Sequence, residues 1–321
     1  MTTSTSPFGG SSAAQDSGYM GFVGVSTGSS SIMSVFPLWA EILGLPTRQL
    51  VGHDLPLDAS PGDYRRLVEQ IRDDPQHRGA LVTTHKMRLY GAAHDLFDEL
   101  DDFAQSCGEI SSITARGSQL IGRAKDPLTA ALALNDFLED DWFAQHPKAE
   151  VLILGAGGAA TALSWALADR TDAPALVTVT ALDQTPLDHL RAVHDARSTP
   201  AGFIRGVVTP TPDAATDLIA PLPAGSLIVN ATGLGKDAPG SPLRDDVVFA
   251  RDTIVWEFNY RGSLEMYHRA LAQRQEQNLV VVDGWRYFIH GWTQVIADVF
   301  DLTLTPQLVE QLAAAAETVR S

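Results

Sequence analysis

The chain has 321 residues, 45% of them hydrophobic, which is enough for two domains with well-buried cores. Its formal net charge of −16, from 23 basic and 39 acidic residues, disfavours nucleic acid and anionic membrane surfaces as partners. A single cysteine, Cys107, excludes an intramolecular disulfide framework and a metal site built from several cysteines. No apolar run reaches transmembrane length and no signal peptide is recognisable, so a cytoplasmic protein is expected.

The first part of the chain alternates apolar, strand-like segments with helical patterns. Residues 1–18 are rich in Ser, Thr and Gly and are predicted to form a disordered tail. The strands and helices predicted next, in chain order, cover residues 19–25, 35–43, 49–54, 63–72 and 79–84. A hairpin is predicted around Arg116-Gly117-Ser118. This order predicts an α/β domain with a mostly parallel sheet over residues 19–125, which we interpret as the substrate domain.

A second domain is predicted over residues 126–284. It opens with a helix at Asp126-Pro127, because Asp is a good N-cap and Pro is favoured at the first helical position. This helix is expected to run to residue 138 and to connect the domains. The further strands are predicted at residues 176–181, 206–208, 227–230, 253–257 and 279–282. Two helices within residues 285–321 are expected to pack back toward the substrate domain.

The segment over residues 150–160, Glu-Val-Leu-Ile-Leu-Gly-Ala-Gly-Gly-Ala-Ala, is the most informative. Its apolar run is typical of a buried parallel strand, and an alanine-rich helical segment follows it. The glycines permit a tight turn, so that the N–H groups at the helix N-terminus can face a pyrophosphate. The turn therefore predicts a dinucleotide-binding Rossmann unit, with a turn that binds nothing as the alternative. The predicted ligand residues in it are Gly155, Gly157, Gly158 and Ala159.

The end of the second strand of such a unit distinguishes NAD from NADP. An acidic residue there bonds the ribose hydroxyls of NAD, whereas Arg or Lys accepts the phosphate of NADP. The segment that follows the strand at residues 176–181 contains Asp183 and no basic residue before Arg191. NAD is therefore predicted in preference to NADP, with a plain N-cap or turn role as the alternative for Asp183.

Lys86 and Asp126 are the candidate catalytic residues. Lys86 comes shortly after a buried-type strand, and Asp126 stands at a helix start just past the end of another strand. Strand and helix ends at one edge of a sheet converge on a cleft. A Lys near a carboxylate can handle the proton of a hydroxyl group that loses hydride. An exposed lysine and a plain N-cap are the alternatives for each residue taken alone.

The order of these motifs resembles the shikimate/quinate dehydrogenase family over roughly residues 20–300. The most specific matches are the Gly-Ala-Gly-Gly-Ala turn and the segment Asn230-Ala-Thr232-Gly233-Leu-Gly. The resemblance implies an N-terminal substrate domain and a C-terminal Rossmann domain that binds NAD(P), with Asn230, Thr232 and Gly233 near the cofactor. It also implies that Lys86 and Asp126 are the catalytic pair.

The resemblance further implies substrate contacts, of which only some are kept. Ser30 retains one hydroxyl of the family's Ser-x-Ser-Pro, and Tyr260 ends the match to its Asp-x-x-Tyr. The two family Asn ligands correspond to Ser111 and Ala124. The family's second Ser and its closing Gln are replaced by Ile32 and Gly291.

New polar side chains near these gaps include Arg286 and His290, which we interpret as compensating substrate ligands. Arg123, Lys125 and Arg261 are further basic candidates, and the sequence leaves their contacts open. Each lost hydrogen bond to a substrate hydroxyl costs about 1–3 kcal/mol. The retained pair and the altered surroundings therefore predict the same hydride transfer on a small hydroxylated substrate other than shikimate.

Three alternatives stay open. One is a true shikimate or quinate dehydrogenase. Another is a catalytically silent protein that senses a metabolite or the cofactor. The third is a relative of methylenetetrahydrofolate dehydrogenases, in which a helical Tyr-x-x-x-Lys is expected, whereas Lys86 follows a strand. The sequence leaves the oligomeric state open, with a homodimer among the options.

Overall fold

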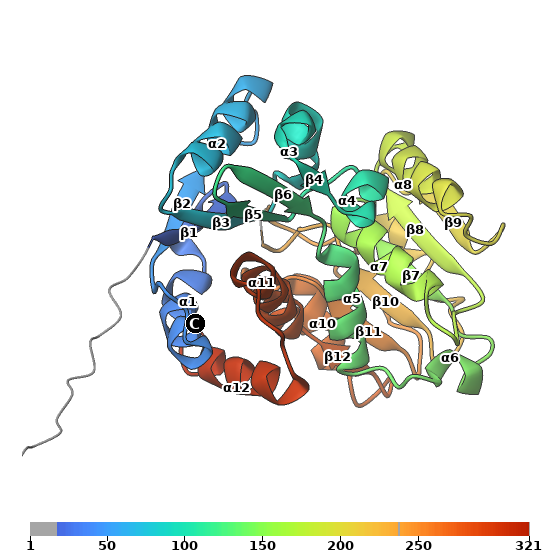
Figure 1. Cartoon of the computed structure of the whole chain (residues 1–321). Helices are drawn as coiled ribbons and strands as arrows, with labels where there is room; N and C mark the ends of the chain where they lie inside the picture. The colour runs from blue at the N-terminus through green and yellow to red at the C-terminus, as the bar shows by residue number, and fades with distance from the viewer. Residues whose placement is uncertain (1–17, 237, 321) are drawn as a thin grey trace, which may run out of the picture.

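The computed structural model describes residues 18–236 and 238–320, so the predicted tail, apart from Gly18, lies outside the described residues. Within these ranges the chain forms two six-stranded sheets, one from each half of the sequence. Helices α5 (Asp126–Asn135) and α11 (Trp285–Phe300) contact each other and lie between the sheets (Figure 1). The predicted α/β class with two sheet-containing parts is confirmed.

The first sheet has the strand order β2-β1-β3-β5-β6-β4. Its strands are β1 (Tyr19–Gly24), β2 (Leu50–Asp54), β3 (His77–Val82), β4 (Glu99–Leu100), β5 (Ser112–Arg116) and β6 (Gln119–Arg123). Strand β1 is parallel to both β2 and β3, and β4 is parallel to β6, whereas β5 is antiparallel to its two neighbours. The β5–β6 pair is the hairpin that the sequence predicts.

Alternating side chains give each face of this sheet its own core. Met20, Phe22 and Leu81 point to one face, whereas Val23 and Val82 point to the other, because successive strand residues alternate. The second face is covered by α2 and α3, the first by α1 and the C-terminal helices. The helices that belong to this half are α1 (Ile32–Leu43), α2 (Pro61–Asp73), α3 (Lys86–Ala93) and α4 (Asp102–Cys107), with 3₁₀ turns η1 (Thr27–Ser29) and η2 (His94–Leu96).

The second sheet is parallel throughout, in the order β12-β11-β10-β7-β8-β9. Its strands are β7 (Val151–Leu154), β8 (Val177–Ala181), β9 (Ile204–Val208), β10 (Leu227–Asn230), β11 (Ile254–Glu257) and β12 (Val280–Val282). Its helices are α6 (Trp142–Gln145), α7 (Gly158–Ala168), α8 (Gln184–Ala196), α9 (Pro212–Thr216) and α10 (Glu265–Gln273). Every residue of β7 is buried, which explains the continuous apolar run of that strand.

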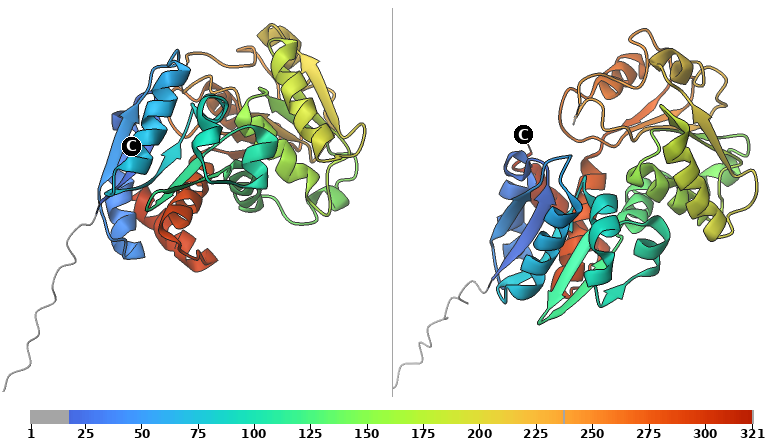
Figure 2. Two further views of the ribbon diagram at one scale, coloured as in Figure 1. Left: turned by 45° about the horizontal axis from the view of Figure 1, so that its top comes forward. Right: turned by 90° about the horizontal axis from the view of Figure 1, so that it is seen from above.

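The C-terminal helices pack on the first sheet rather than on the second. Side chains of α11 and of α12 (Pro306–Glu317) share one buried cluster with β1 and α1. Figures 1 and 2 both draw this helix pair against the N-terminal half. The exact domain limits at residues 125 and 284 stay a prediction. Across residues 18–236 and 238–320, no helix is long and apolar enough to cross a membrane.

Replacing Leu312 by Ala should destabilise the protein by about 2–5 kcal/mol, because truncation of a fully buried side chain leaves a cavity in the cluster that joins α12 to the first sheet. The neighbouring indole of Trp39 donates a 2.7 Å hydrogen bond to the Leu312 carbonyl, which ties α1 to α12. Denaturant unfolding measures the effect. Gln311→Ala, at an exposed position of the same helix, is the matched control. Equal stability of the two variants would contradict a structural role of the Leu312 side chain in the buried cluster.

Candidate active site

The turn between β7 and α7 has the geometry of an anion-binding cradle. Gly155 has φ +101°, and a Cβ there would lie 2.8 Å from the Ala231 carbonyl oxygen, so only glycine fits without strain. A Cβ on Gly157, the N-cap of α7, would meet no atom within 4 Å. Open space thus lies in front of the first N–H groups of α7, which have no partner within the helix. These residues fit the pyrophosphate of a dinucleotide.

The turn after β10 packs beside this cradle and is held by its own side chains. The Asn230 side-chain oxygen Oδ1 accepts hydrogen bonds from the Thr232 backbone N–H and hydroxyl, at 3.1 and 2.7 Å. Its amide nitrogen donates to the Glu257 carboxyl at 2.8 Å. Burial raises the pKa of Glu257 to about 7, although hydrogen bonds from Asn230 and Asn259 oppose the shift. Asn230 and Thr232 therefore shape the turn, and Gly233 follows with φ +76°.

Asp183 lies at the end of β8, where the sequence analysis expects it. It is exposed and is the N-cap of α8, with its side chain accepting from the Thr185 N–H at 2.9 Å. This is the alternative role that the sequence left open. The cap explains the residue without a cofactor, so it does not by itself select NAD.

The fold brings Lys86 and Asp126 together from two helices that are 40 residues apart in the sequence. Lys86 is the first residue of α3, and Asp126 is the first residue of α5. The Asp126 carboxylate makes no capping bond, as an N-cap would, but accepts a hydrogen bond from the Lys86 ammonium. The two side chains are 23% and 11% exposed, so the pair opens only partly to solvent. The sequence prediction that the two residues lie close together is confirmed.

The ammonium form of Lys86 is favoured in this pair. Burial lowers the pKa of Lys86, but the negative charges of Asp126 and Glu109, with the hydrogen bond to Asp126, raise it more. The pKa of Lys86 consequently lies above its ordinary value. At neutral pH the site therefore presents a hydrogen-bond donor with a fixed positive charge.

Glu109 and Tyr287 are two further polar residues that the sequence analysis did not select. Glu109 Oε1 and the Tyr287 hydroxyl are both buried without a hydrogen-bond partner among the described residues. Burial and the charges of Asp126 and Glu109 raise the pKa of Tyr287 well above its ordinary value. Because buried polar atoms without partners are costly, two of them beside the Lys86–Asp126 pair indicate space where a ligand supplies the missing partners.

The substrate residues implied by the family resemblance have different surroundings. The Ser30 hydroxyl lies 3.4 Å from the Tyr260 hydroxyl, so these two residues form one polar group. The Ser111 oxygen instead accepts the Lys125 backbone N–H at 2.7 Å, and its hydroxyl lies 3.5 Å from the Arg123 carbonyl. Ser111 thus stabilises the loop that leads into α5.

Arg286 and His290 are not brought to the Lys86–Asp126 pair. Both bond to Asp136, at 2.6 and 2.8 Å, and Arg286 also pairs with Glu310 of α12 at 2.5 Å. Asp136 is the C-cap of α5, ten residues after Asp126, which corresponds to about 15 Å along the helix axis. Arg286 and His290 therefore connect α11 to the far end of α5 through Asp136, and their predicted contact with a substrate stays a prediction.

Two of the other three new basic residues also form ion pairs within the protein. Arg123 and Lys125 both pair with Asp298 of α11, at 2.8 and 3.2 Å, and the Ser112 hydroxyl donates to the same carboxylate. Arg261 differs, because its Nε is buried without a hydrogen-bond partner among the described residues. Of the basic candidates, Arg261 and His290 thus each have a buried nitrogen without a partner among the described residues, Nε in Arg261 and Nδ1 in His290.

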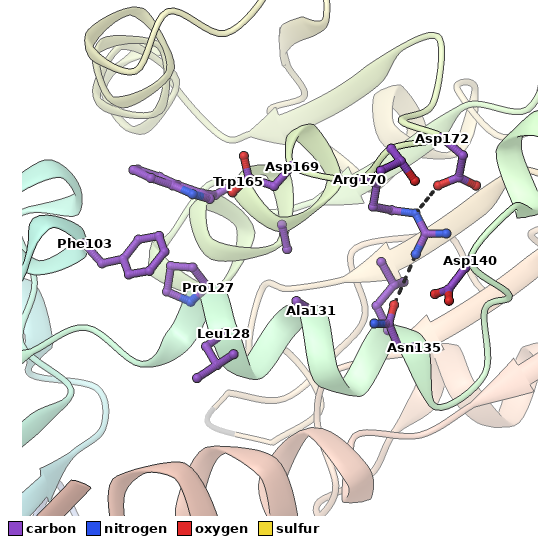
Figure 3. Close-up of a pocket in the computed structure, with 13 residues that line it drawn as sticks. Phe103, Pro127, Leu128, Ala131, Asn135, Asp140, Trp165, Asp169, Arg170 and Asp172 are labelled. Carbon is purple, nitrogen blue, oxygen red and sulfur yellow. Dashed lines mark hydrogen bonds and ion pairs between the residues drawn. The ribbon is translucent and has the colours of Figure 1, made fainter. Parts of the chain in front are cut away.

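A separate hollow of about 500 Å³ lies between α5 and α7. Figure 3 shows Phe103 and Trp165 toward one end of it and Arg170 with Asp172 toward the other. Lys86, Asp126 and Glu109 do not line it. Its lining residues lie on another side of α5 from Asp126, so the hollow is separate from the candidate active site.

The parallel sheet with its glycine turn, and the buried Lys–Asp pair on the other half, define a two-domain oxidoreductase scaffold of the NAD(P)-binding class. No protein-family model matches the chain. A shikimate dehydrogenase (NADP(+)) from Methylobacterium radiotolerans is 30% identical over 80% of this chain and 89% of that protein. The chain therefore belongs to the shikimate/quinate dehydrogenase family.

A second curated relative agrees with this assignment, and a solved structure shares the fold. A shikimate dehydrogenase (NADP(+)) from Streptococcus gordonii is 28% identical over 58% of this chain, and the match spans 60% of that protein's length. The fold is similar to that of a quinate dehydrogenase from Corynebacterium glutamicum solved in complex with NAD. The TM-score is 0.70 at 20% identity, covering 95% of this chain and 100% of that one.

Proposed function

We propose that the chain is a nicotinamide-dependent dehydrogenase that oxidises a secondary alcohol of a small hydroxylated substrate, or reduces the corresponding ketone. The observation that carries the proposal is the buried Lys86–Asp126 pair. Membership of the shikimate/quinate dehydrogenase family and the cradle at the start of α7 support it. Bound at this cradle, a nicotinamide dinucleotide would supply the hydride acceptor or donor.

The two residues have complementary tasks in this mechanism. Lys86, held as an ammonium, donates a hydrogen bond to the substrate oxygen and fixes its position. Asp126 accepts the proton of the substrate hydroxyl as the carbinol carbon gives up its hydride, so that the ketone forms and the proton remains on the enzyme until water removes it. In the reverse direction the same groups return the proton to the oxygen. Ser30 and Tyr260 would orient the substrate, through the polar group that they share.

The substrate should differ from shikimate. A substrate hydroxyl or carboxylate that contacts Ile32 or Ala124 would find no hydrogen-bond partner in their side chains, and the Ser111 hydroxyl is engaged with the loop before α5. The unpartnered guanidinium nitrogen of Arg261, next to Tyr260, instead favours a substrate with an acidic group in a different place. Candidate classes are cyclitols, modified ring acids and sugar-derived alcohols.

Replacing Lys86 by Met should lower turnover by about two to four orders of magnitude, because a positioned acid–base group contributes about 10²–10⁴-fold. Dinucleotide affinity should stay within a few-fold, since the lysine lies in the first half of the chain. Turnover is measured on the substrate found by screening, and affinity by calorimetry. Lys148→Met, at an exposed position, is the matched control. Undiminished turnover of the Lys86 variant would remove the catalytic assignment.

A screen of hydroxylated compounds by NADH or NADPH absorbance should find shikimate and quinate to be poor substrates, because sites that lose hydrogen-bond partners lose affinity and discrimination. Oxidation of shikimate with a kcat/KM of about 10⁴ M⁻¹s⁻¹ or above would refute this expectation and restore the ordinary activity of the family. If no member of a broad alcohol panel is turned over while the dinucleotide binds, a catalytically silent sensor becomes the better explanation.

NAD should bind more tightly than NADP, because the carboxylate of Asp183 at the end of β8 would repel the additional phosphate. The predicted preference for NAD differs from the cofactor in the names of the two curated relatives, which are shikimate dehydrogenases (NADP(+)). Titration calorimetry with both cofactors measures the difference, and Asp183→Asn, which can still cap α8, should narrow it. Equal affinities in the unmodified protein, or a preference for NADP, would contradict the assignment.

A further inference from the structure

Glu109 connects the catalytic pair to the dinucleotide cradle. It follows Gly108, the left-handed C-cap of α4 at φ +64°, and only 2% of its surface is exposed. Its side chain reaches the other half of the molecule, because a Cβ built on Gly158 would lie 2.6 Å from Glu109 Oε2. Glu109 Oε1 has no hydrogen-bond partner among the described residues. A buried carboxyl therefore points at the first residue of α7, the place that suits an anion.

The groups that face Glu109 come from several elements. Lys86 of α3 lowers the pKa of Glu109, whereas burial, Asp126 of α5 and Asp101 before α4 raise it, and the result is about 8. Burial raises the pKa of the Cys107 thiol on α4 to about 12. Tyr287 of α11 also faces Glu109, whose charge contributes to the raised pKa of Tyr287. His189 of α8 lies beside Gly108, the residue before Glu109.

We propose that Glu109 is a ligand-binding residue of this site, which must carry its proton for a dinucleotide pyrophosphate to bind at the N-terminus of α7. The proposal rests on the proposed function, since that function assigns the dinucleotide to this turn. The N-terminus of α7 favours one negative charge in front of it. An ionised Glu109 would place a second charge beside the pyrophosphate, in a site where little water screens the repulsion. A protonated Glu109 removes that charge and supplies an O–H donor.

The sign of the pH dependence follows from proton linkage. At pH values well below its raised pKa Glu109 is neutral, so binding of the pyrophosphate needs no proton. Above that pKa the free protein carries the ionised carboxyl, and binding must take up a proton from solution. The dissociation constant of the wild type should then rise by up to about tenfold per pH unit. A variant with a neutral side chain at this position should show no such rise.

The test uses ADP-ribose, which has the pyrophosphate and both riboses but no nicotinamide. Wild type and Glu109→Gln are titrated by calorimetry between about pH 6.5 and pH 9.5, in buffers of different ionisation enthalpy. At low pH the two proteins should bind ADP-ribose with equal affinity. At high pH the wild type alone should bind more weakly and take up a proton on binding, whereas the affinity of Glu109→Gln should not change with pH. Glu276→Gln, at an exposed position, should behave as the wild type does.

Two outcomes overturn the proposal in different ways. If wild type and Glu109→Gln lose affinity in parallel as the pH rises, Glu109 is not the linked group, while the proposed function stands. If ADP-ribose binds neither protein at any pH, the proposed function falls as well. Should Glu109→Gln fail to fold, Glu109→Ala must give the same flat profile. As an independent readout, the wild type should lose stability relative to the neutral variant as the pH rises from about 4.5, where Glu109 ionises in the unfolded chain, to about 8, where it ionises in the folded protein, and the difference should stay constant above that.

Discussion

The ion pair between Lys86 and Asp126 is the contact on which the site depends. It joins the first residues of α3 and α5, two helices that begin at one edge of the first sheet. A buried charge needs its partner, because removal of either group leaves the other uncompensated at a cost of several kcal/mol. The geometry of the catalytic pair therefore depends on the positions of β3, which precedes Lys86, and of the hairpin and α5, which place Asp126. The same pair sets the electrostatic environment of Glu109 and Tyr287, whose pKa values respond to Asp126.

Helix α11 holds the two halves around this pair. Asp298 near its C-terminal end binds Arg123, the last residue of β6, and Lys125, just before α5. Arg286 and His290 near its N-terminal end bind Asp136, at the other end of α5. Several of the polar residues that set this chain apart from the family pattern thus connect α11 to the two ends of α5. The altered substrate surroundings then consist of lost partners, while Arg261 Nε, His290 Nδ1 and the Tyr287 hydroxyl are buried without a partner among the described residues.

Much of this architecture was predictable because its signals are local. The apolar run of β7, the glycine turn and the hairpin around Gly117 follow from the period of the pattern and from the backbone freedom of glycine. The short elements β4, α4, α6 and α9 were not predicted, since two to six residues show no period, and the longer helices α3, α8 and α10 were also missed. The predicted helix end at residue 138 lies three residues beyond the observed end at Asn135, and helix ends are the least reliable part of such predictions.

By itself, the sequence determined the α/β class and the dinucleotide-type turn, because short motifs and strand order carry that information, and its resemblance to a known family implied the pairing of Lys86 with Asp126. Only the tertiary structure decided which polar side chains are free. The sequence suggests Arg286 and His290 as substrate ligands, but in the structure both bond to Asp136. The sequence gives no reason to select Glu109, whose role depends on its contact with Gly158 of the other half. The physical reason is that the hydrogen-bond partners and burial of a charged group are set by residues distant in the chain, which no local pattern encodes.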